Sequence, residues 1–270
     1  ETAFLDPGPL RALCAPLLVS LMERVLIPDP AVERILTAAR RDLLQLVADP
    51  GPLPAAGDAH ERFAAALARQ CFLNEYAYAY AESDEERDAL ASLRAALEGD
   101  AGAEDRPARM RIMVFGCYAP LHTLASTAEL EAATLAGTGD ARFLDVVRHQ
   151  VVEPLAERHI GARIPSLGTV TDGTSRKVGA QYEDNPYPRW QSPGAHTPRP
   201  LAEVMAQLFP HLSHDRLPGS GALEILVAGC GTGRHAIMSA RRFAGARVLA
   251  VDLSRASLAF AARKAGELGV

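Results

Sequence analysis

The first 165 residues carry apolar side chains at the three- and four-residue spacing of amphipathic helices. Residues 6–25 follow this pattern, and Asp29-Pro30 then supplies an N-cap and a first-turn proline for a helix over 31–47. The SDEE run at 83–86 forms a capping box that opens another helix. Further helices are predicted over residues 60–81, 107–125, 127–136 and 140–159. We therefore expect an α-helical N-terminal domain over residues 1–165.

A different pattern follows a short helix predicted at 201–212. Residues 223–252 give, in order, an apolar strand, a glycine-rich turn, a helix, a second apolar strand and an acid, Asp252. Glycines let a backbone approach a ligand closely, a helix start offers unpaired N–H groups, and Asp252 can accept hydrogen bonds from a ribose diol. The order predicts the first βαβα part of an α/β Rossmann-like domain over 201–270, with a nucleotide-like cofactor.

Two known glycine patterns fit this turn. Counted from Gly229, the pattern is G-x-G-x-G, with Gly231 and Gly233 as its other members. Counted from Gly231, it is G-x-G-x-x-A, which ends at Ala236 and has Asp252 about 20 residues further on, as in an NAD(P)-binding oxidoreductase. The glycines alone leave both patterns open.

The surrounding residues favour the first pattern. AGCGTGRHA at 228–236, followed by VLAVDLSRASLAFAARKA at 248–265, resembles class I S-adenosylmethionine-dependent methyltransferases. In that family a hydrophobic-Asp-hydrophobic-Ser run typically follows the second strand. The resemblance implies S-adenosyl-L-methionine as cofactor, with contacts from Ala228, Gly229, Cys230, Gly231, Gly233, Asp252 and Leu253.

One position departs from the family pattern. An acidic residue usually stands two positions before the first glycine and helps to organise the methionine end of the cofactor, whereas this chain has Val227 there. Other groups are therefore expected to hold that end.

The resemblance extends upstream. Residues 63–86, 146–168, 175–190 and 225–236 resemble, in that order, a group of bacterial proteins that carry a class I methyltransferase domain. In that group the domain is often fused to tetratricopeptide repeats, although no repeat of that length is visible in this sequence. The resemblance implies methyl transfer and leaves the acceptor, a small molecule or a protein, open.

Residues 166–200 are expected to form a linker, and QYEDNPYPRW at 181–190 is its most distinctive part. Pro186 and Pro188 favour an extended backbone after a helix that ends near Tyr182. Two hypotheses fit. Tyr182, Tyr187 and Arg189 could form a lid over the methionine end of the cofactor, with Arg189 as a carboxylate partner. Alternatively, the segment is an aromatic-anchored clamp between domains.

Composition bears on three further questions: whether the protein binds nucleic acid, holds a metal or spans a membrane. A formal net charge of -5 disfavours a nucleic-acid partner, which would normally require a basic surface. The four cysteines are scattered without metal-ligand spacing, so no metal is expected and reduced thiols in a cytoplasm are the simplest interpretation. No run of 18 apolar residues predicts a membrane span, and a basic complement made almost entirely of arginine suggests a bacterial genome rich in G and C.

The sequence begins at Glu1 and ends at Val270, soon after Asp252, so we expect a C-terminally truncated, inactive fragment that binds cofactor weakly or not at all. No residue is assigned to catalysis, and a general base, if the acceptor needs one, is expected beyond Val270. A further hypothesis is that the helical region is a protein-interaction module attached to a methyltransferase remnant. Oligomeric state is not predicted.

Overall fold

In the computed structural model, the described residues are 4, 6–48, 57–73, 80–99, 105–137, 139–168, 171–184, 186–213, 217 and 223–270. The chain divides into two compact units, residues 1–155 and residues 156–270, and each is described by itself. The sequence placed this boundary near residue 165.

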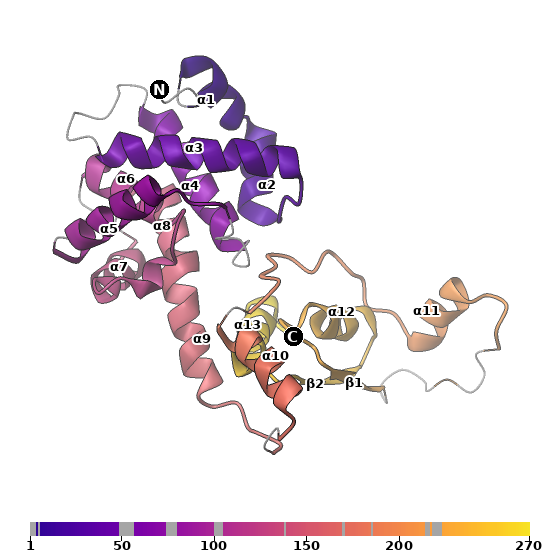
Figure 1. Cartoon of the computed structure of the whole chain (residues 1–270). Coiled ribbons are helices and arrows are strands. Elements are labelled where there is room, and N and C mark those ends of the chain that lie inside the picture. The colour runs from indigo at the N-terminus through magenta and orange to yellow at the C-terminus, as the bar shows by residue number, and fades with distance from the viewer. Residues whose placement is uncertain are drawn as a thin grey trace. The chain divides into compact units, whose positions relative to one another are not determined.

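The regular elements described in the first unit are all helical (Figure 1). They are α1 (Pro7–Leu13), α2 (Pro16–Arg24), α3 (Pro30–Ala48), α4 (Gly57–Leu73), α5 (Asp84–Gly99), α6 (Arg106–Phe115), a 3-10 turn (Leu121–Thr123), α7 (Thr127–Leu135), α8 (Ala141–Val147) and a π-helical turn (Arg148–Val152) that continues into α9 (Glu153–Gly161). Their apolar faces enclose one core, in which Phe63, Leu67, Met110 and Phe115 are fully buried. Burial of such side chains is the main source of stability in a helical unit.

Both predicted helix starts are confirmed by their hydrogen bonds. The Asp29 carboxylate accepts from the backbone amides of Ala31 and Val32 at 2.8 and 2.9 Å. In the capping box, Ser83 N donates to Glu86 Oε2 at 2.9 Å and Glu86 N donates to Ser83 Oγ at 3.2 Å. These contacts satisfy amides that the first turn of each helix would otherwise leave unpaired.

Three predicted helices have different bounds. The stretch 6–25 is broken between α1 and α2, because Pro16 has no amide hydrogen and disfavours a helical conformation at Ala15. The stretch 107–125 stops being α-helical after Phe115. The predicted helix 60–81 begins at Gly57 as α4, and residues 74–79, with Tyr76 and Tyr78, lie outside the described residues.

The helix predicted at 140–159 contains the π-helical turn, which sequence periodicity did not indicate. The hydrogen bonds of Gln150 explain why the π-helical turn lies at this point of the chain. The side-chain amide of this buried residue donates to the carbonyls of Ala68 and Gly116, and its oxygen accepts from Leu121 N. The wider turn thus lets one side chain satisfy three buried backbone groups.

The second unit contains the part of α9 after residue 155 and the elements that follow it. These are α10 (Gly173–Asp184), α11 (Leu201–Leu208), β1 (Glu224–Ala228), α12 (Arg234–Arg242), β2 (Arg247–Val251) and α13 (Arg255–Leu268). The strands pair in parallel, with Leu226 opposite Leu249, and α12 makes the crossover. The expected β-α-β-α order is confirmed.

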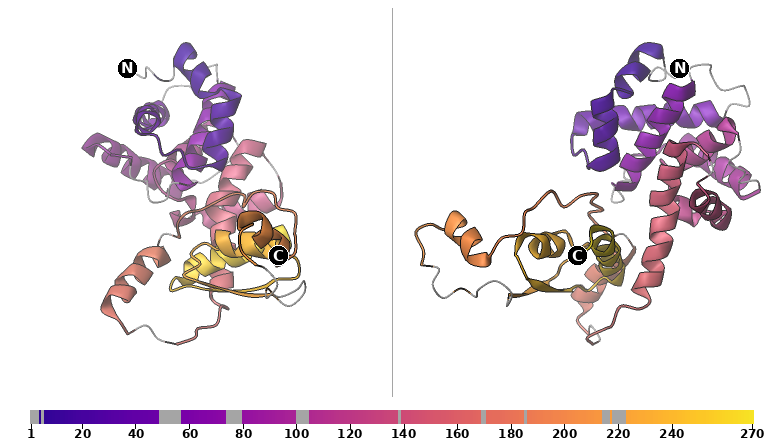
Figure 2. Two further views of the ribbon diagram at one scale, coloured as in Figure 1. Left: turned by 90° about the vertical axis from the view of Figure 1, so that its right-hand side faces the viewer. Right: turned by 180° about the vertical axis from the view of Figure 1, so that it is seen from behind.

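Helix α12 contacts both strands, and α13 lies beside α12 (Figure 2). Strand side chains alternate between the faces of a sheet, and Val227 on β1 is 8% exposed. On the other face Leu226 and Leu249 are 65% and 63% exposed. Helix α10 packs against α13, so part of the segment predicted as a linker is a packed helix.

Candidate functional site

A turn of three glycines connects β1 to α12. Gly229, Gly231 and Gly233 have φ angles of +67°, +52° and +76°, a region that side chains other than glycine adopt at a cost. The amides of Gly229 and Cys230 both donate to the carbonyl of Val251, at 2.9 and 3.1 Å. The turn is therefore tied to the end of β2.

The three glycines face different surroundings. A Cβ atom added to Gly229 or Gly231 would have no heavy atom within 4 Å, so both positions border open space. A Cβ atom on Gly233 would stand 2.4 Å from the Cβ of Ala261 on α13. Gly229 and Gly231 thus leave a bare backbone open to a ligand, whereas Gly233 allows the turn to pack on α13.

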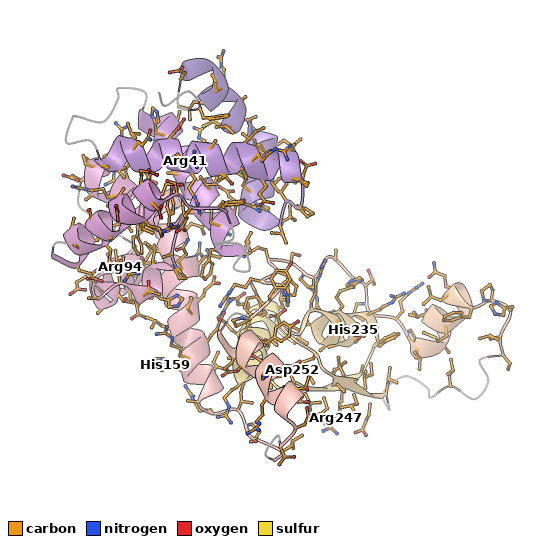
Figure 3. All side chains as sticks on the ribbon, in the orientation of Figure 1. Arg41, Arg94, His159, His235, Arg247 and Asp252 are labelled. Atoms are coloured by element: carbon orange, nitrogen blue, oxygen red, sulfur yellow. The ribbon has the colours of Figure 1, made fainter. Side chains whose placement is uncertain are left out.

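Asp252, labelled in Figure 3, lies immediately after β2 and bonds to the same turn. Its Oδ2 accepts from Gly231 N at 2.7 Å, and its Oδ1 accepts from Ser254 N at 2.9 Å. A carboxylate has about four lone-pair positions, so each oxygen can still accept a bond from a ligand hydroxyl. Ser254 Oγ in turn accepts from Ser257 N at 3.0 Å and caps α13.

The start of α12 is the third part of the candidate site, beside the glycine turn and Asp252. Gly233 is its N-cap and provides no side-chain cap, so the first-turn amides of α12 rely on other partners. The Asp252 carboxylate can accept hydrogen bonds from the hydroxyl groups of a ligand, and the amides at the start of α12 favour a negatively charged group. The bare backbone of the turn lets such a ligand come close.

This stretch is the part of the chain that matches a known family. Residues 225–270 match the model of a family described as a methyltransferase domain. The match begins in β1 and takes in the glycine turn, Asp252 and α13. No curated protein and no solved structure matches the chain.

Within the matched stretch, Cys230 stands between the two open glycines and is partly buried. Burial, aided by the negative charge of Asp252, raises the pKa of its thiol to about 11. At neutral pH Cys230 is therefore a neutral thiol, which suits a small side chain in a tight turn and does not suit a nucleophile.

The other predicted site residues fall into two groups. Tyr182, which is 39% exposed, is held near Asp252 because its carbonyl accepts from Ser254 Oγ at 2.9 Å. Leu253 is also exposed, at 53%. The guanidinium of Arg189 is buried, and its Nη1 lies 3.2 Å from Glu157 Oε2. Tyr187 is half-buried between Pro186 and Pro188.

Val227 occupies the position at which the resemblance leads one to expect an acid. It pairs with Ala250 in the sheet and is buried. An apolar side chain suits this buried place, because a carboxylate there would lose its contact with water.

Histidine, cysteine and carboxylate side chains form no metal site in the described ranges. Among these residues, no group of three or more His, Cys, Asp or Glu side chains could hold a metal ion. His235 is exposed on α12 (Figure 3), and His214 lies outside the described residues. Within the same ranges, no helix is both long and apolar enough to cross a membrane.

The contacts of Thr232, inside the glycine turn, and of Glu157 were not predicted from sequence. Thr232 donates its hydroxyl to the carbonyl of Pro188 at 2.8 Å, and its own carbonyl accepts from Trp190 Nε1 at 3.0 Å. Glu157, in α9, accepts from both Arg189 and Arg263. The only tryptophan in the sequence, Trp190, was a visible signal for the contact with Thr232. A glutamate on a helix, such as Glu157, gives no comparable signal.

Proposed function

We propose that this chain binds S-adenosyl-L-methionine at the glycine turn and acts as a methyltransferase. The observation that carries the proposal is the open space over Gly229 and Gly231 beside the Asp252 carboxylate. The match of residues 225–270 to a methyltransferase domain supports the same assignment.

In this proposal the residues from Ala228 to Gly231 face the cofactor with their backbone, and Asp252 accepts hydrogen bonds from the ribose hydroxyls. Tyr182 and Leu253 flank Asp252, and their exposed side chains supply apolar contact. Gly233 contributes by allowing the turn to close on α13.

The glycine geometry favours this cofactor over NAD(P). In a dinucleotide pattern counted from Gly231, the second glycine, Gly233, must let the backbone approach the pyrophosphate. A Cβ atom at Gly233 would instead meet Ala261 of α13 at 2.4 Å, so this position faces protein. The two open glycines are the first two of the pattern counted from Gly229.

S-adenosyl-L-methionine supplies an activated methyl group on a sulfonium, whose departure leaves a neutral thioether. The contribution of this chain's residues is then mainly to bind and orient the donor. The acceptor, a small molecule or a protein, is set by groups other than the glycine turn.

Ligand binding to the full-length protein tests the proposal. We expect S-adenosyl-L-methionine and S-adenosylhomocysteine to raise the unfolding temperature and to give saturable heats in calorimetry, since a ligand that binds only the folded state stabilises it. NAD and NADP should do neither. Stabilisation by NAD alone would favour the oxidoreductase hypothesis, and no effect of any ligand at millimolar concentration would refute both.

A further inference from the structure

We propose that Trp190 and Thr232 are positioning residues for the cofactor site, which hold the glycine turn in its binding conformation from a segment about 40 residues upstream. The inference rests on the proposed function. The contacts that carry it lie within residues 156–270.

Two hydrogen bonds join the upstream segment to the middle of the glycine turn. Trp190 Nε1 donates to the carbonyl of Thr232 at 3.0 Å, and Thr232 Oγ1 donates to the carbonyl of Pro188 at 2.8 Å. Trp190 is 6% exposed and Thr232 is 3% exposed, so water competes little for either bond. Thr232 is therefore fixed through both its backbone and its side chain. We refer to these two bonds as the Trp–Thr clamp.

Packing holds Trp190 in place. Its indole clusters with Ile237 of α12 and Phe260 of α13, and it meets the Phe260 ring edge-on with a centroid distance of 5.8 Å. Such edge-to-face contacts stabilise a defined ring orientation. The indole N–H is thereby aimed by α12, which follows the glycine turn in sequence, and by α13, on which Gly233 packs.

A buried ion cluster anchors the residue before Trp190. Arg189 Nη1 and Arg263 Nη2 lie 3.2 and 2.8 Å from the carboxylate oxygens of Glu157. Both guanidinium groups also lie over the Phe260 ring, at 5.5 and 5.2 Å from its centroid. Because each charge is buried against an opposite one, the cluster restricts the segment to one placement.

The glycine turn needs such external support. Gly231 and Gly233 have positive φ angles and no side chains, so the turn loses much conformational freedom when it becomes ordered. Thr232 is the residue between them, and the Trp–Thr clamp fixes it before any ligand arrives. A ligand that binds a turn already ordered avoids that entropic cost.

Conservative variants test whether Trp190 and Thr232 position the glycine turn or only stabilise the fold. Trp190→Phe retains a ring beside Phe260 and loses the indole donor, and Thr232→Val retains the branched shape and loses the hydroxyl. Val204→Ala, at a fully buried position in α11, is the control for lost stability in the same unit. We expect each clamp variant to bind S-adenosylhomocysteine at least tenfold more weakly by calorimetry, and Val204→Ala to bind within twofold of the natural protein.

Hydrogen exchange at two amides provides a readout that needs no ligand. Gly231 N donates to Asp252 and Gly233 N donates to the carbonyl of Cys230, so both amides should be protected. We expect exchange at these amides to rise at least tenfold in Trp190→Phe and Thr232→Val, and to be unchanged in Val204→Ala. In the double variant the increase in exchange should be smaller than the product of the two single increases, because both bonds act on Thr232.

The outcomes of the two proposals are distinguishable. If the natural protein binds no S-adenosyl compound, the proposed function fails, and exchange at Gly231 and Gly233 still decides whether the clamp orders the turn. If it binds, but both clamp variants match Val204→Ala in affinity and exchange, the positioning role is wrong. Should Trp190→Phe not fold, Thr232→Val alone carries the test.

Discussion

Gly231 N donates a 2.7 Å hydrogen bond to Oδ2 of Asp252, so the turn after β1 and the acid after β2 are directly joined. Carboxyl ends of neighbouring parallel strands lie at one edge of a sheet, which brings these residues together although 21 positions separate them. The same carboxylate raises the pKa of the Cys230 thiol, after the larger effect of burial. One acidic residue therefore both bonds to the backbone of the turn and adds to the electrostatic effect on its thiol.

We expect Asp252→Asn to weaken binding of S-adenosyl-L-methionine about tenfold, because hydrogen bonds to a charged acceptor contribute about 1.5 kcal/mol or more. Calorimetric titration of the variant checks this value. The matched control is Glu224→Gln, which removes the same charge at the far end of β1. Glu224 and its partner Arg247 are 78% and 85% exposed, so affinity should not change. Equal affinities in Asp252→Asn and the natural protein would remove Asp252 from the site.

Alanine at Gly231 should mainly reduce cofactor affinity, whereas alanine at Gly233 should mainly reduce stability. Gly231→Ala places a methyl group in open space, so the protein should lose about 1 kcal/mol from the left-handed backbone and lose most of its cofactor affinity. Gly233→Ala forces a methyl group against Ala261 and should cost about 3 kcal/mol of stability. Chemical denaturation and calorimetric titration measure the two quantities separately.

A second substitution tests the packing explanation for Gly233. Ala261→Gly removes the atom that the new methyl group would meet, so it should restore part of the stability lost in Gly233→Ala. No such recovery is expected for Gly231→Ala, which has no neighbour to relieve. If Ala261→Gly lowers stability equally in both backgrounds, contact with α13 is not the reason for glycine at 233.

Local sequence signals predicted the features that depend on neighbouring residues. The capping box at Ser83 and Glu86 and the N-cap at Asp29 were visible because each cap is bonded within three residues along the chain. The β-α-β-α order was visible from periodicity and glycines. The family resemblance then identified the glycine turn and Asp252 as the candidate site.

Features that depend on distant residues were not predictable. Glu157 meets Arg263 across 106 positions, and nothing around Glu157 distinguishes it from a glutamate on an exposed helix. The protein partner of Arg189 was not visible either, because its charge fits a ligand carboxylate as well as a protein one. The π-helical turn at Arg148–Val152 also depends on remote partners, since Gln150 bonds to Ala68 across 82 positions.

In the helical unit, Ser83→Ala should lower the free energy of unfolding by about 1 kcal/mol, because it removes the acceptor for Glu86 N. Urea denaturation followed by circular dichroism measures the change. Ser92→Ala is a suitable control, since Ser92 Oγ bonds only locally to the carbonyl of Asp88 within α5 and alanine favours a helix. A loss of stability in Ser92→Ala equal to that in Ser83→Ala would show that the capping box contributes nothing.

The raised pKa of Cys230 predicts slow alkylation near neutral pH. With a pKa of about 11, the thiolate that reacts with iodoacetamide should be about a hundredfold scarcer at pH 8 than in a free cysteine. The rate should rise with pH until it levels off above pH 11. Cys14, Cys71 and Cys117 are buried, and Cys230→Ser identifies any signal from them.

Removing the charge beside this thiol tests the electrostatic part of the shift. In Asp252→Asn the pKa of Cys230 should fall, because the neutral amide no longer opposes the thiolate, while burial still keeps it above the value of a free cysteine. The pH dependence of alkylation should therefore move to lower pH, and it should stay in place in Glu224→Gln. An unchanged profile in Asp252→Asn would mean that burial alone raises the pKa, and that the carboxylate does not face the thiol.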